Sequence, residues 1–398
     1  MNELYKFQKP EARRIFMWHW GKEGAGAKFT MALGAALSGL DGRALHMSAA
    51  DHSDLALDLA RSGSHPYTPV SIFTGDKQTL AGKLSAASAL LKLPRIGFDF
   101  KNALDQFKPD LALCSFQSIW DLATLPILKH SARPFVLCLH DAEPHPGDRY
   151  PLRAKAMAWQ INTSDALIVM SDHVADTAHS LYHYPRERIF KIPHGRFDFT
   201  GADNQARIFP EARPFRLLFL GRITEYKGLP LLLEAYRTLL ASQRAFSLTI
   251  AGSGDLGAAR GMIEHLPNIE LINEWLSDDE IAKYLKSADA VILPYIEASQ
   301  SGVAAAAFSA GLPVIATPIG GLKEQIAHGV TGLIAKEVSA DALADSILEL
   351  ATTPALYEAL SHGALTHAST TLDWKNIGVT LASALDHIMT LPKRQTIQ

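Results

Sequence analysis

Short, continuously apolar segments alternate with longer helical patterns along this chain, and this alternation limits the fold more than any other feature. A run that is apolar at every position suits a strand covered on both faces, as in a parallel sheet. The longer segments supply the helical crossovers that parallel strands need. The expected strands form two series, residues 15–18, 44–47, 111–114, 135–138, 166–170 and 189–192, followed by residues 217–220, 248–251, 269–272, 291–293 and 314–316.

The length of the chain also argues for two domains. With 398 residues, it is too long for one ordinary hydrophobic core. Two series of strands therefore predict an α/β protein with two Rossmann-like, doubly wound domains. The break is expected in the segment 194–215, where glycine and proline interrupt the periodic pattern. We predict a first domain over residues 1–196 and a second over residues 197–371.

The last periodic segment predicts one more helix. Trp374, Ile377, Leu381, Leu385 and Ile388 recur at intervals of three and four residues, which gives a helix a single apolar stripe. Because this helix follows the whole second domain, the pattern alone allows it to pack on either half.

Composition excludes several classes of protein. The formal net charge of −3 gives no bulk attraction to nucleic acid. The two cysteines, Cys114 and Cys138, lie in apolar strand-like runs, which indicates buried thiols in a reducing compartment. Residues 1–14 are polar and lack the apolar core of a signal peptide. Since no apolar run reaches the ~18 residues of a membrane span, we expect a cytoplasmic protein.

A basic amphipathic segment leaves the relation to membranes open. Residues 83–95 combine four leucines with Lys83, Lys92 and Arg95. A helix of this kind can lie on the inner face of a membrane as a peripheral contact. The alternative is an ordinary surface helix whose apolar side packs on the core.

Two cations follow the first strand of the second series. Gly221 ends that strand, and Arg222 and Lys227 come directly after it. Ligands of open parallel sheets bind outside the carboxyl ends of the strands. Arginine grips a phosphate with its forked donors, and lysine adds a compact charge. The alternative is that both are ordinary surface cations of a loop.

An acidic residue and a polar turn follow a later strand of the same series. The turn precedes an alanine-rich helix, whose free N–H groups attract a phosphate. Glu297 is unsuited to phosphate and instead fits an acceptor for sugar hydroxyls. A helix-capping role explains the serines but not the glutamate. The candidate ligand-binding residues here are Ser299, Gln300, Ser301, Gly302 and Val303.

Three further loops add weaker candidates. Gly252 and Gly254 follow a strand of the second series, and Trp275 follows the next one, where it can border a flat base or pack in the core. In the first half, Gly24 and Gly26 lie between the first strand and a helix, so they predict a loop that approaches a phosphate. They do not form the full dinucleotide-binding pattern.

Histidine at the end of a first-half strand is the remaining candidate. His140 and Asp141 end the strand 135–138, and His145 and Asp148 follow them. An imidazole in this position suits catalysis or contact with a sugar. Metal binding is the alternative, but the cluster lacks ordered helical spacing. His194, at the predicted domain junction, is expected to line the cleft.

Taken in order, short segments of the second half resemble the retaining glycosyltransferases of the GT-B fold, specifically glycosyltransferase family 4. The segments are residues 219–222, 226–228, 251–254, 288–294, 297–303, 313–317, 320–324 and 329–333. Each is weak alone, but together they are specific over about residues 215–335. The first half resembles that family more loosely.

The resemblance implies two Rossmann-like domains that face each other across a cleft. It implies a nucleotide-sugar donor held mainly by the second domain, an acceptor bound by the first, retention of anomeric configuration, and no metal or other cofactor. Arg222 and Lys227 match the diphosphate-binding cations, Glu297 the acid that contacts the sugar, and His140 the first-domain histidine near it. The final helix, residues 372–392, matches one that completes the first domain.

One departure from that family concerns the nucleotide ribose. The usual pattern has a second glutamate eight residues after the first, but this chain has Ala305 there. Recognition of the ribose by a carboxylate is therefore not expected. The polar turn 298–302 resembles a subgroup with this variant, so the loss does not by itself imply an inactive protein.

The expected activity is that of a hexosyltransferase. The donor is a nucleoside-diphosphate sugar, the acceptor is a polysaccharide or lipid-linked glycan, and nucleic acid is no partner. One alternative is a nucleotide-sugar epimerase of the same architecture, which would need His140 and Glu297 as acid–base groups. Another is a degenerate protein that binds nucleotide or recruits partners without turnover, which Ala305 would explain.

Overall fold

Two parallel sheets organise the chain. The structure, a computed structural model, describes residues 12–72, 90–144, 153–199 and 205–394. The strands of the first half are β1 (Arg13–His19), β2 (Arg43–Ala50), β3 (Tyr67–Val70), β4 (Leu111–Cys114), β5 (Phe135–Leu139), β6 (Ala166–Val169) and β7 (Ile189–Lys191). Its helices are α1 (Ala25–Ser38), α2 (Asp54–Ser62), α4 (Leu93–Phe107), α5 (Leu125–His130), α6 (Arg153–Thr163) and α7 (Asp172–Tyr182), with short 3-10 turns η1 (Leu90–Lys92), η2 (Ile119–Ala123) and η3 (Arg186–Arg188).

The second half repeats this organisation. Its strands are β8 (Phe215–Leu220), β9 (Phe246–Ala251), β10 (Ile269–Ile272), β11 (Ala290–Leu293), β12 (Val314–Ala316) and β13 (Gly332–Ile334). The helices are α8 (Leu229–Leu239), α9 (Ala259–Glu264), α10 (Asp278–Ser287), α11 (Gly302–Ser309), α12 (Leu322–Gln325), α13 (Ala340–Thr352), α14 (Pro354–Thr370) and α15 (Trp374–Thr390), with the 3-10 turn η4 (Glu225–Lys227).

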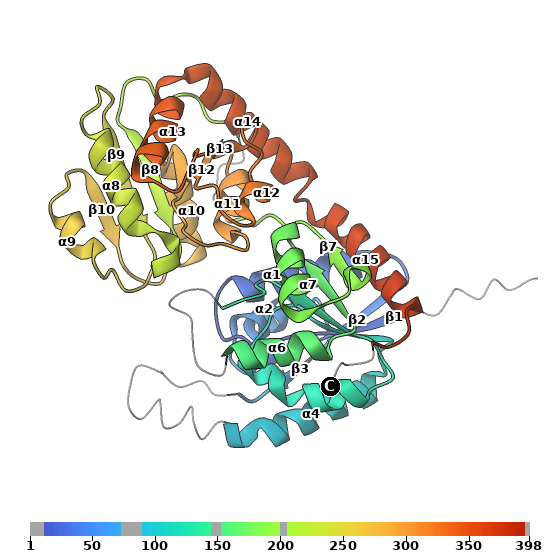
Figure 1. Cartoon of the computed structure of the whole chain (residues 1–398). Helices are drawn as coiled ribbons and strands as arrows, with labels where there is room; N and C mark the ends of the chain where they lie inside the picture. The colour runs from blue at the N-terminus through green and yellow to red at the C-terminus, as the bar shows by residue number, and fades with distance from the viewer. Residues whose placement is uncertain (1–11, 73–89, 145–152, 200–204, 395–398) are drawn as a thin grey trace, which may run out of the picture.

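The strand order of each sheet has one reversal, which locates a ligand crevice. Within the described residues, the first sheet has the order β3-β2-β1-β4-β5-β6-β7 and the second β10-β9-β8-β11-β12-β13. Neighbouring strands are parallel, for example β1 with β4 and β8 with β11. The order reverses at β1 and at β8, and in such sheets ligands bind at the carboxyl ends of these strands. The prediction of two doubly wound α/β domains is confirmed (Figure 1).

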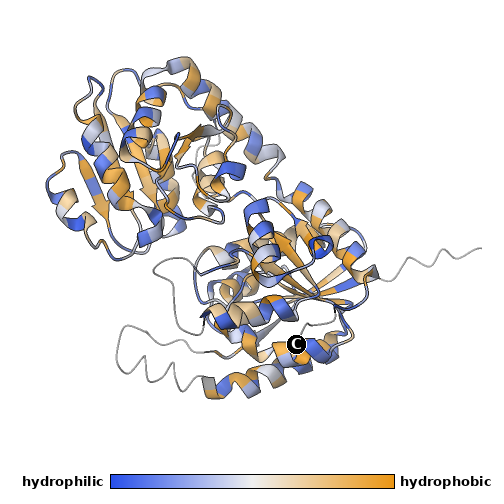
Figure 2. Ribbon diagram, in the orientation of Figure 1, coloured by the Kyte–Doolittle hydropathy of each residue, from blue (hydrophilic) through white to orange (hydrophobic). Residues whose placement is uncertain are grey.

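The expected strands are present, but two strands were missed. β3 contains Pro69 and lies at an edge of its sheet, where proline is tolerated. β13 has only three residues and begins with glycine, so it shows no apolar run. Figure 2 shows that hydrophobic residues concentrate in the strands of both sheets. Both cysteines are buried and free, as predicted.

Helix α15 packs on the first sheet's layer, which resolves the ambiguity left by its sequence. Ile377, Leu381, Leu385 and Ile388 share one core cluster with residues of β1 and α1. A side chain at Gly378 would meet the carbonyl oxygen of Ala36 at 2.7 Å, so the helices α1 and α15 are in close contact. Figure 1 shows α15 extending from α14 along the body that contains β1 and β2.

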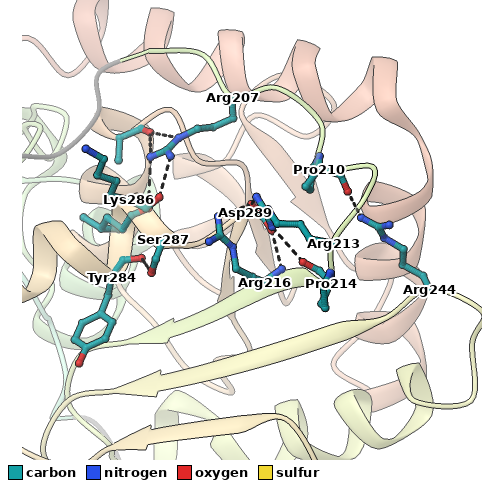
Figure 3. Close-up of polar contacts among 12 residues, drawn as sticks. Arg207, Pro210, Arg213, Pro214, Arg216, Arg244, Tyr284, Lys286, Ser287 and Asp289 are labelled. Atoms are coloured by element: carbon teal, nitrogen blue, oxygen red, sulfur yellow. Dashed lines mark hydrogen bonds and ion pairs between the residues drawn. The ribbon is translucent and has the colours of Figure 1, made fainter.

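Arginines fasten the segment between the domains to the second sheet. Arg213 donates two hydrogen bonds to the carboxylate of Asp289, at 2.5 and 2.6 Å, and the N–H of Arg216 donates another at 2.8 Å. The guanidinium of Arg207 donates to the carbonyl oxygens of Ala310 and Lys286 (Figure 3). Asp289 is almost fully buried, so these bonds compensate the loss of water around its charge.

The described residues give limited information on membrane contact. No helix among residues 12–72, 90–144, 153–199 and 205–394 is both long and apolar enough to cross a membrane. Of the predicted basic amphipathic segment, Lys83 and Leu84 lie outside the described residues. Its described part, residues 90–95, forms η1 and the start of α4, a helix in which Ile96 and Phe100 are buried in the first core while Phe98 is exposed.

Candidate functional site

The loops that follow β8 and β11 are in direct contact at the carboxyl edge of the second sheet. Ile296 donates its N–H to the carbonyl oxygen of Tyr226 at 2.9 Å. Gly228 has a φ of 68°, and a Cβ atom there would lie 1.9 Å from the carbonyl oxygen of Pro294. The structure therefore brings together the loop that contains Arg222 and Lys227 and the loop that contains Glu297, which are distant in the sequence.

Lys227 is the group that joins these two loops. Its Nζ donates a hydrogen bond of 2.5 Å to the hydroxyl of Tyr295 and lies 3.9 Å from the centroid of that ring. Burial raises the pKa of Tyr295, so its hydroxyl stays protonated and can donate to Ser301 Oγ, 3.3 Å away. The chain Lys227–Tyr295–Ser301 thus connects the cation to the start of α11.

The charge of Lys227 is only weakly stabilised by the protein. The pKa of Lys227 is lowered to about 8, chiefly by burial; the charge of Arg222 contributes to the lowering, while Tyr226 and Asp141 oppose it. Asp141 follows His140 in the first domain, so both domains contribute to this environment. An anionic ligand placed here would raise the pKa of Lys227, because an opposite charge favours the ammonium form.

The first turn of α11 is fixed and exposes two backbone donors. Ser301 caps the helix, with its Oγ accepting from the N–H of Ala304. Gln325 binds the backbone of Ser301 twice, at 2.8 Å each, through its amide oxygen and its amide nitrogen. No described residue accepts from the N–H groups of Gly302 and Val303. A helix start of this kind favours an anion.

His140 belongs to the first domain but lies against the loop that precedes α11 in the second domain. Its Nε2 donates to the carbonyl oxygen of Ser115 at 3.0 Å, and its Nδ1 accepts from Gln300 Nε2 at 2.9 Å. The ring packs against Phe29 and Phe116, with centroids 4.7 and 4.0 Å away. Burial lowers the pKa of His140 to about 3, so the ring is neutral.

Glycines of the neighbouring loop allow two backbones to approach each other. A Cβ atom at Gly252 would lie 2.1 Å from the carbonyl oxygen of Gly221, and one at Gly254 would lie 2.0 Å from that of Ile223. Contact between the loops after β8 and β9 therefore explains both residues without any ligand. Their role in donor binding stays a prediction.

The glycine loop of the first domain faces the second domain. Gly24 has a φ of 102°, and a Cβ there would lie 3.6 Å from the ring of Trp275. Trp275 is 57% exposed, so it is no core residue. Lys28 and Asp278 form an ion pair between α1 and α10, the helices that follow these two loops. The predicted candidates Gly24 and Trp275 thus lie opposite each other.

Two histidines add to the site, one of which the sequence analysis missed. His19 ends β1, donates from Nδ1 to the carbonyl oxygen of Phe116 at 3.0 Å, and lies against Gly26. Burial lowers the pKa of His19 to about 4, although its hydrogen bond with Phe116 opposes this effect. The signal was its place at a strand end, like that of His140. His194 is buried as well, and its ring lies 3.7 Å from a Cβ placed on Gly302.

Three further predicted positions differ in their exposure to solvent. Glu297 is half-buried at the start of its loop, and Arg222 is exposed beside Lys227. Ala305 is fully buried in the core cluster that also contains Phe197. Within the described residues, no group of three or more His, Cys, Asp or Glu side chains is arranged as metal ligands.

Glu324 fastens the second domain to the first beside this site. Its carboxylate accepts from the N–H groups of Asp172 and His173, at 2.6 and 2.8 Å, at the N-terminus of α7. Lys191 lies 3.8 Å from the same carboxylate. A second bond joins Ser171 Oγ to the carbonyl oxygen of Ser299 at 3.0 Å. The favourable charge at a helix N-terminus strengthens the Glu324 contact.

We expect Glu324→Ala to weaken contact between the domains. Loss of a helix cap of this kind costs about 0.5–2 kcal/mol, which here destabilises only the arrangement in which the domains touch. Small-angle scattering should show a larger radius of gyration than for the unchanged protein. Glu337→Ala is the matched control, because Glu337 is exposed and has no bond to the first domain. Identical scattering curves for Glu324→Ala and the unchanged protein would contradict the prediction.

Two protein-family models match this chain, one in each half. The model described as Glycosyl transferases group 1 matches residues 214–353, and the model described as Glycosyltransferase Family 4 matches residues 79–196. The first match contains the loops after β8 and β11, and the second contains His140.

Curated relatives match parts of the chain. The amylovoran biosynthesis glycosyltransferase AmsK of Erwinia amylovora is 37% identical over 150 residues, which are 35% of this chain and 36% of the relative. A D-inositol 3-phosphate glycosyltransferase of Catenulispora acidiphila is 29% identical over 241 residues, 56% of this chain and 57% of the relative. The chain therefore spans between about a third and three fifths of these relatives.

Solved structures match the fold over nearly the whole chain. HepE of Anabaena in complex with UDP-glucose has a TM-score of 0.71 at 17% identity, with 94% of this chain and 99% of that chain covered. Sucrose-phosphate synthase of Thermosynechococcus elongatus has a TM-score of 0.69 at 17% identity, with the same shares covered. At this identity the likeness concerns the fold.

Proposed function

We propose, from the premise that this chain belongs to the group 1 glycosyltransferases of family 4 with the GT-B fold, that it transfers a hexose-type sugar. The donor is a nucleoside-diphosphate sugar, and the acceptor group is a hydroxyl. The observation that carries the proposal is the contact between Lys227 and the start of α11 through Tyr295. A cation and a helix start with unpaired N–H groups meet where a doubly wound sheet binds ligands.

The diphosphate is the part of the donor that these groups suit. Arg222 and Lys227 supply two positive charges, and Gly302 and Val303 supply the N–H donors. Negative charge grows on the diphosphate as the bond to the sugar lengthens. Preorganised donors and charges stabilise that state more than the bound substrate, which is how they accelerate the reaction.

The sugar and the base of the donor are proposed to contact residues around the diphosphate site. Glu297 follows β11 and is proposed to accept hydrogen bonds from sugar hydroxyls. His140 and Gln300 border the same space from the two domains. Trp275 and Gly24 are proposed to border the base, because they lie opposite each other at the end of β10 and β1.

A retaining mechanism without a metal ion suits this set of residues. The acceptor hydroxyl attacks the sugar carbon from the face that the diphosphate leaves, and a phosphate oxygen takes the hydroxyl proton. The new bond to the acceptor oxygen replaces the bond to the phosphate oxygen, so no protein nucleophile is needed. Arg222 and Lys227 are proposed to neutralise the negative charge of the diphosphate, as a metal ion does in other enzymes.

The acceptor is proposed to be a polysaccharide or a lipid-linked glycan. The relative from Erwinia amylovora is named for amylovoran biosynthesis, which favours this class. The first domain, with α1 and the loop after β5, is proposed to bind it.

The test is binding followed by transfer. The protein is mixed with UDP-glucose, UDP-galactose, UDP-N-acetylglucosamine, GDP-mannose and ADP-glucose, and its unfolding temperature is measured. A donor that binds only the folded state at about 100 times its Kd adds about 2.7 kcal/mol of stability. We expect at least one to stabilise the protein and to be consumed when glycan acceptors are added. Stabilisation by none would contradict the proposal.

We also expect affinity for the free nucleoside diphosphate to fall as pH rises through about 8. The pKa of Lys227 is lowered to about 8 by burial, so above that pH the protein must take up a proton to bind the anion. Titration calorimetry of UDP or GDP between pH 7 and pH 9.5 measures this. Lys227→Arg is the control, since arginine keeps its charge over this range. A flat profile for the unchanged protein would show that Lys227 does not meet the diphosphate.

A further inference from the structure

The hydrogen bonds of His140 fix the orientation of the amide of Gln300. A carbonyl oxygen only accepts, so Nε2 of His140, 3.0 Å from that of Ser115, carries a proton. A neutral ring then has a lone pair on Nδ1, which needs a donor. Gln300 Nε2 meets that need at 2.9 Å. The opposite orientation of the amide would require a doubly protonated ring, which burial disfavours.

This orientation leaves the other end of the amide unsatisfied. Gln300 Oε1 is shielded from solvent, and no described residue donates a hydrogen bond to it. A buried acceptor without a donor is unfavourable, so the pair is incomplete as a purely structural contact. The group that completes it must be a donor, which excludes the oxygens of an ionised diphosphate and favours a hydroxyl.

The position of Gln300 indicates which part of the donor carries this hydroxyl. It lies two residues before Gly302, whose N–H is proposed to bind the diphosphate, and three residues after Glu297. The group attached to the diphosphate at this point is the sugar. Because Oε1 is shielded while the domains touch, the sugar has to enter while they are apart and is enclosed when His140 and Gln300 meet.

We propose that Gln300 is a positioning residue for the donor sugar. Its amide N–H holds His140 in one tautomer across the domain interface, and its amide oxygen accepts a hydrogen bond from a hydroxyl of that sugar. The inference rests on the proposed function, and it adds a residue that recognises the sugar of the donor rather than its nucleotide.

The test compares two ligands that differ only in the sugar. Dissociation constants are measured by calorimetry for the nucleotide sugar that stabilises the unchanged protein and for the matching free nucleoside diphosphate, for example UDP-glucose and UDP. Gln300→Met keeps the length of the side chain but removes the amide, and we expect it to weaken the sugar nucleotide about tenfold and leave the free diphosphate unchanged. Gln300→Ala should do the same, and Gln243→Met is the control at an exposed glutamine.

Three outcomes have distinct meanings. A selective loss for the sugar nucleotide supports the role of Gln300. An equal loss for both ligands, or no loss for either, overturns it while the proposed function stands. If none of the five nucleotide sugars binds the unchanged protein, both the proposed function and the role of Gln300 are wrong.

The tautomer is tested without any ligand. Long-range proton–nitrogen NMR correlations report which ring nitrogen of a histidine is protonated, and the signals of His140 are those lost in His140→Gln. We expect a proton on Nε2 alone in the unchanged protein and a mixture of tautomers in Gln300→Met. A ring protonated on Nδ1 in the unchanged protein would overturn the inference.

Discussion

Replacing Lys227 or Arg222 by alanine is expected to lower the rate constant of transfer about 100- to 1,000-fold, because removal of one preorganised charge typically has this effect. Lys227 should show the larger loss. It is partly buried, so its charge acts through less water, whereas Arg222 is exposed. The measurement is kcat with the donor identified by stabilisation, together with the unfolding temperature, which shows that the variants fold.

Matched controls separate this effect from a general change of charge. Lys286→Ala and Arg237→Ala remove exposed cations from α10 and α8 of the same domain and should leave kcat unchanged. Lys227→Arg should retain part of the activity at neutral pH because it keeps the charge. Near-normal rates for both Lys227→Ala and Arg222→Ala would refute the proposed diphosphate site.

Gly228→Ala is expected to destabilise the protein by about 2–4 kcal/mol, through strain and a clash of backbone atoms. Gly228 has a left-handed φ of 68°, and its added Cβ would lie 1.9 Å from the carbonyl oxygen of Pro294. The loop after β8 would have to move away from the loop after β11. Urea unfolding followed by circular dichroism measures the change in stability.

The appropriate control is a glycine that has the left-handed conformation of Gly228 but not its close contact with another backbone segment. Gly329 has a φ of 77°, and a Cβ there would have no atom within 4 Å. Gly329→Ala should therefore cost only about 1 kcal/mol, the strain of the left-handed region. Equal losses for Gly228→Ala and Gly329→Ala would mean that the two loops can separate without penalty.

Much of the fold could be predicted from the sequence because the strands are apolar at nearly every position. The runs that became β5 and β11 contain no polar residue, so burial on both faces was the only suitable environment. β3 could not be found in this way, since Pro69 interrupts it. The apolar stripe of α15 predicted a helix, but the sequence could not show that this stripe packs against α1 and β1 of the first domain.

The candidate site was predictable where its residues directly follow strands of the same parallel sheet. Lys227 and Glu297 each follow a strand, and the carboxyl ends of parallel strands meet at one edge. The bond between Gln300 and His140 was not predictable, because it joins residues 160 positions apart in different domains. The same holds for Glu324 and the N-terminus of α7, which meet only when both domains are folded.

The position of α15 has a consequence for the order in which the domains fold during synthesis. Residues of β1 and α1 leave the ribosome first, but their core also contains Ile377, Leu381 and Leu385. The intervening second domain is synthesised at about 5–20 residues per second, a delay on the order of ten seconds or more. During that time an apolar face of α1 remains uncovered and available to chaperones. The C-terminal half should therefore reach its native core before the N-terminal half does.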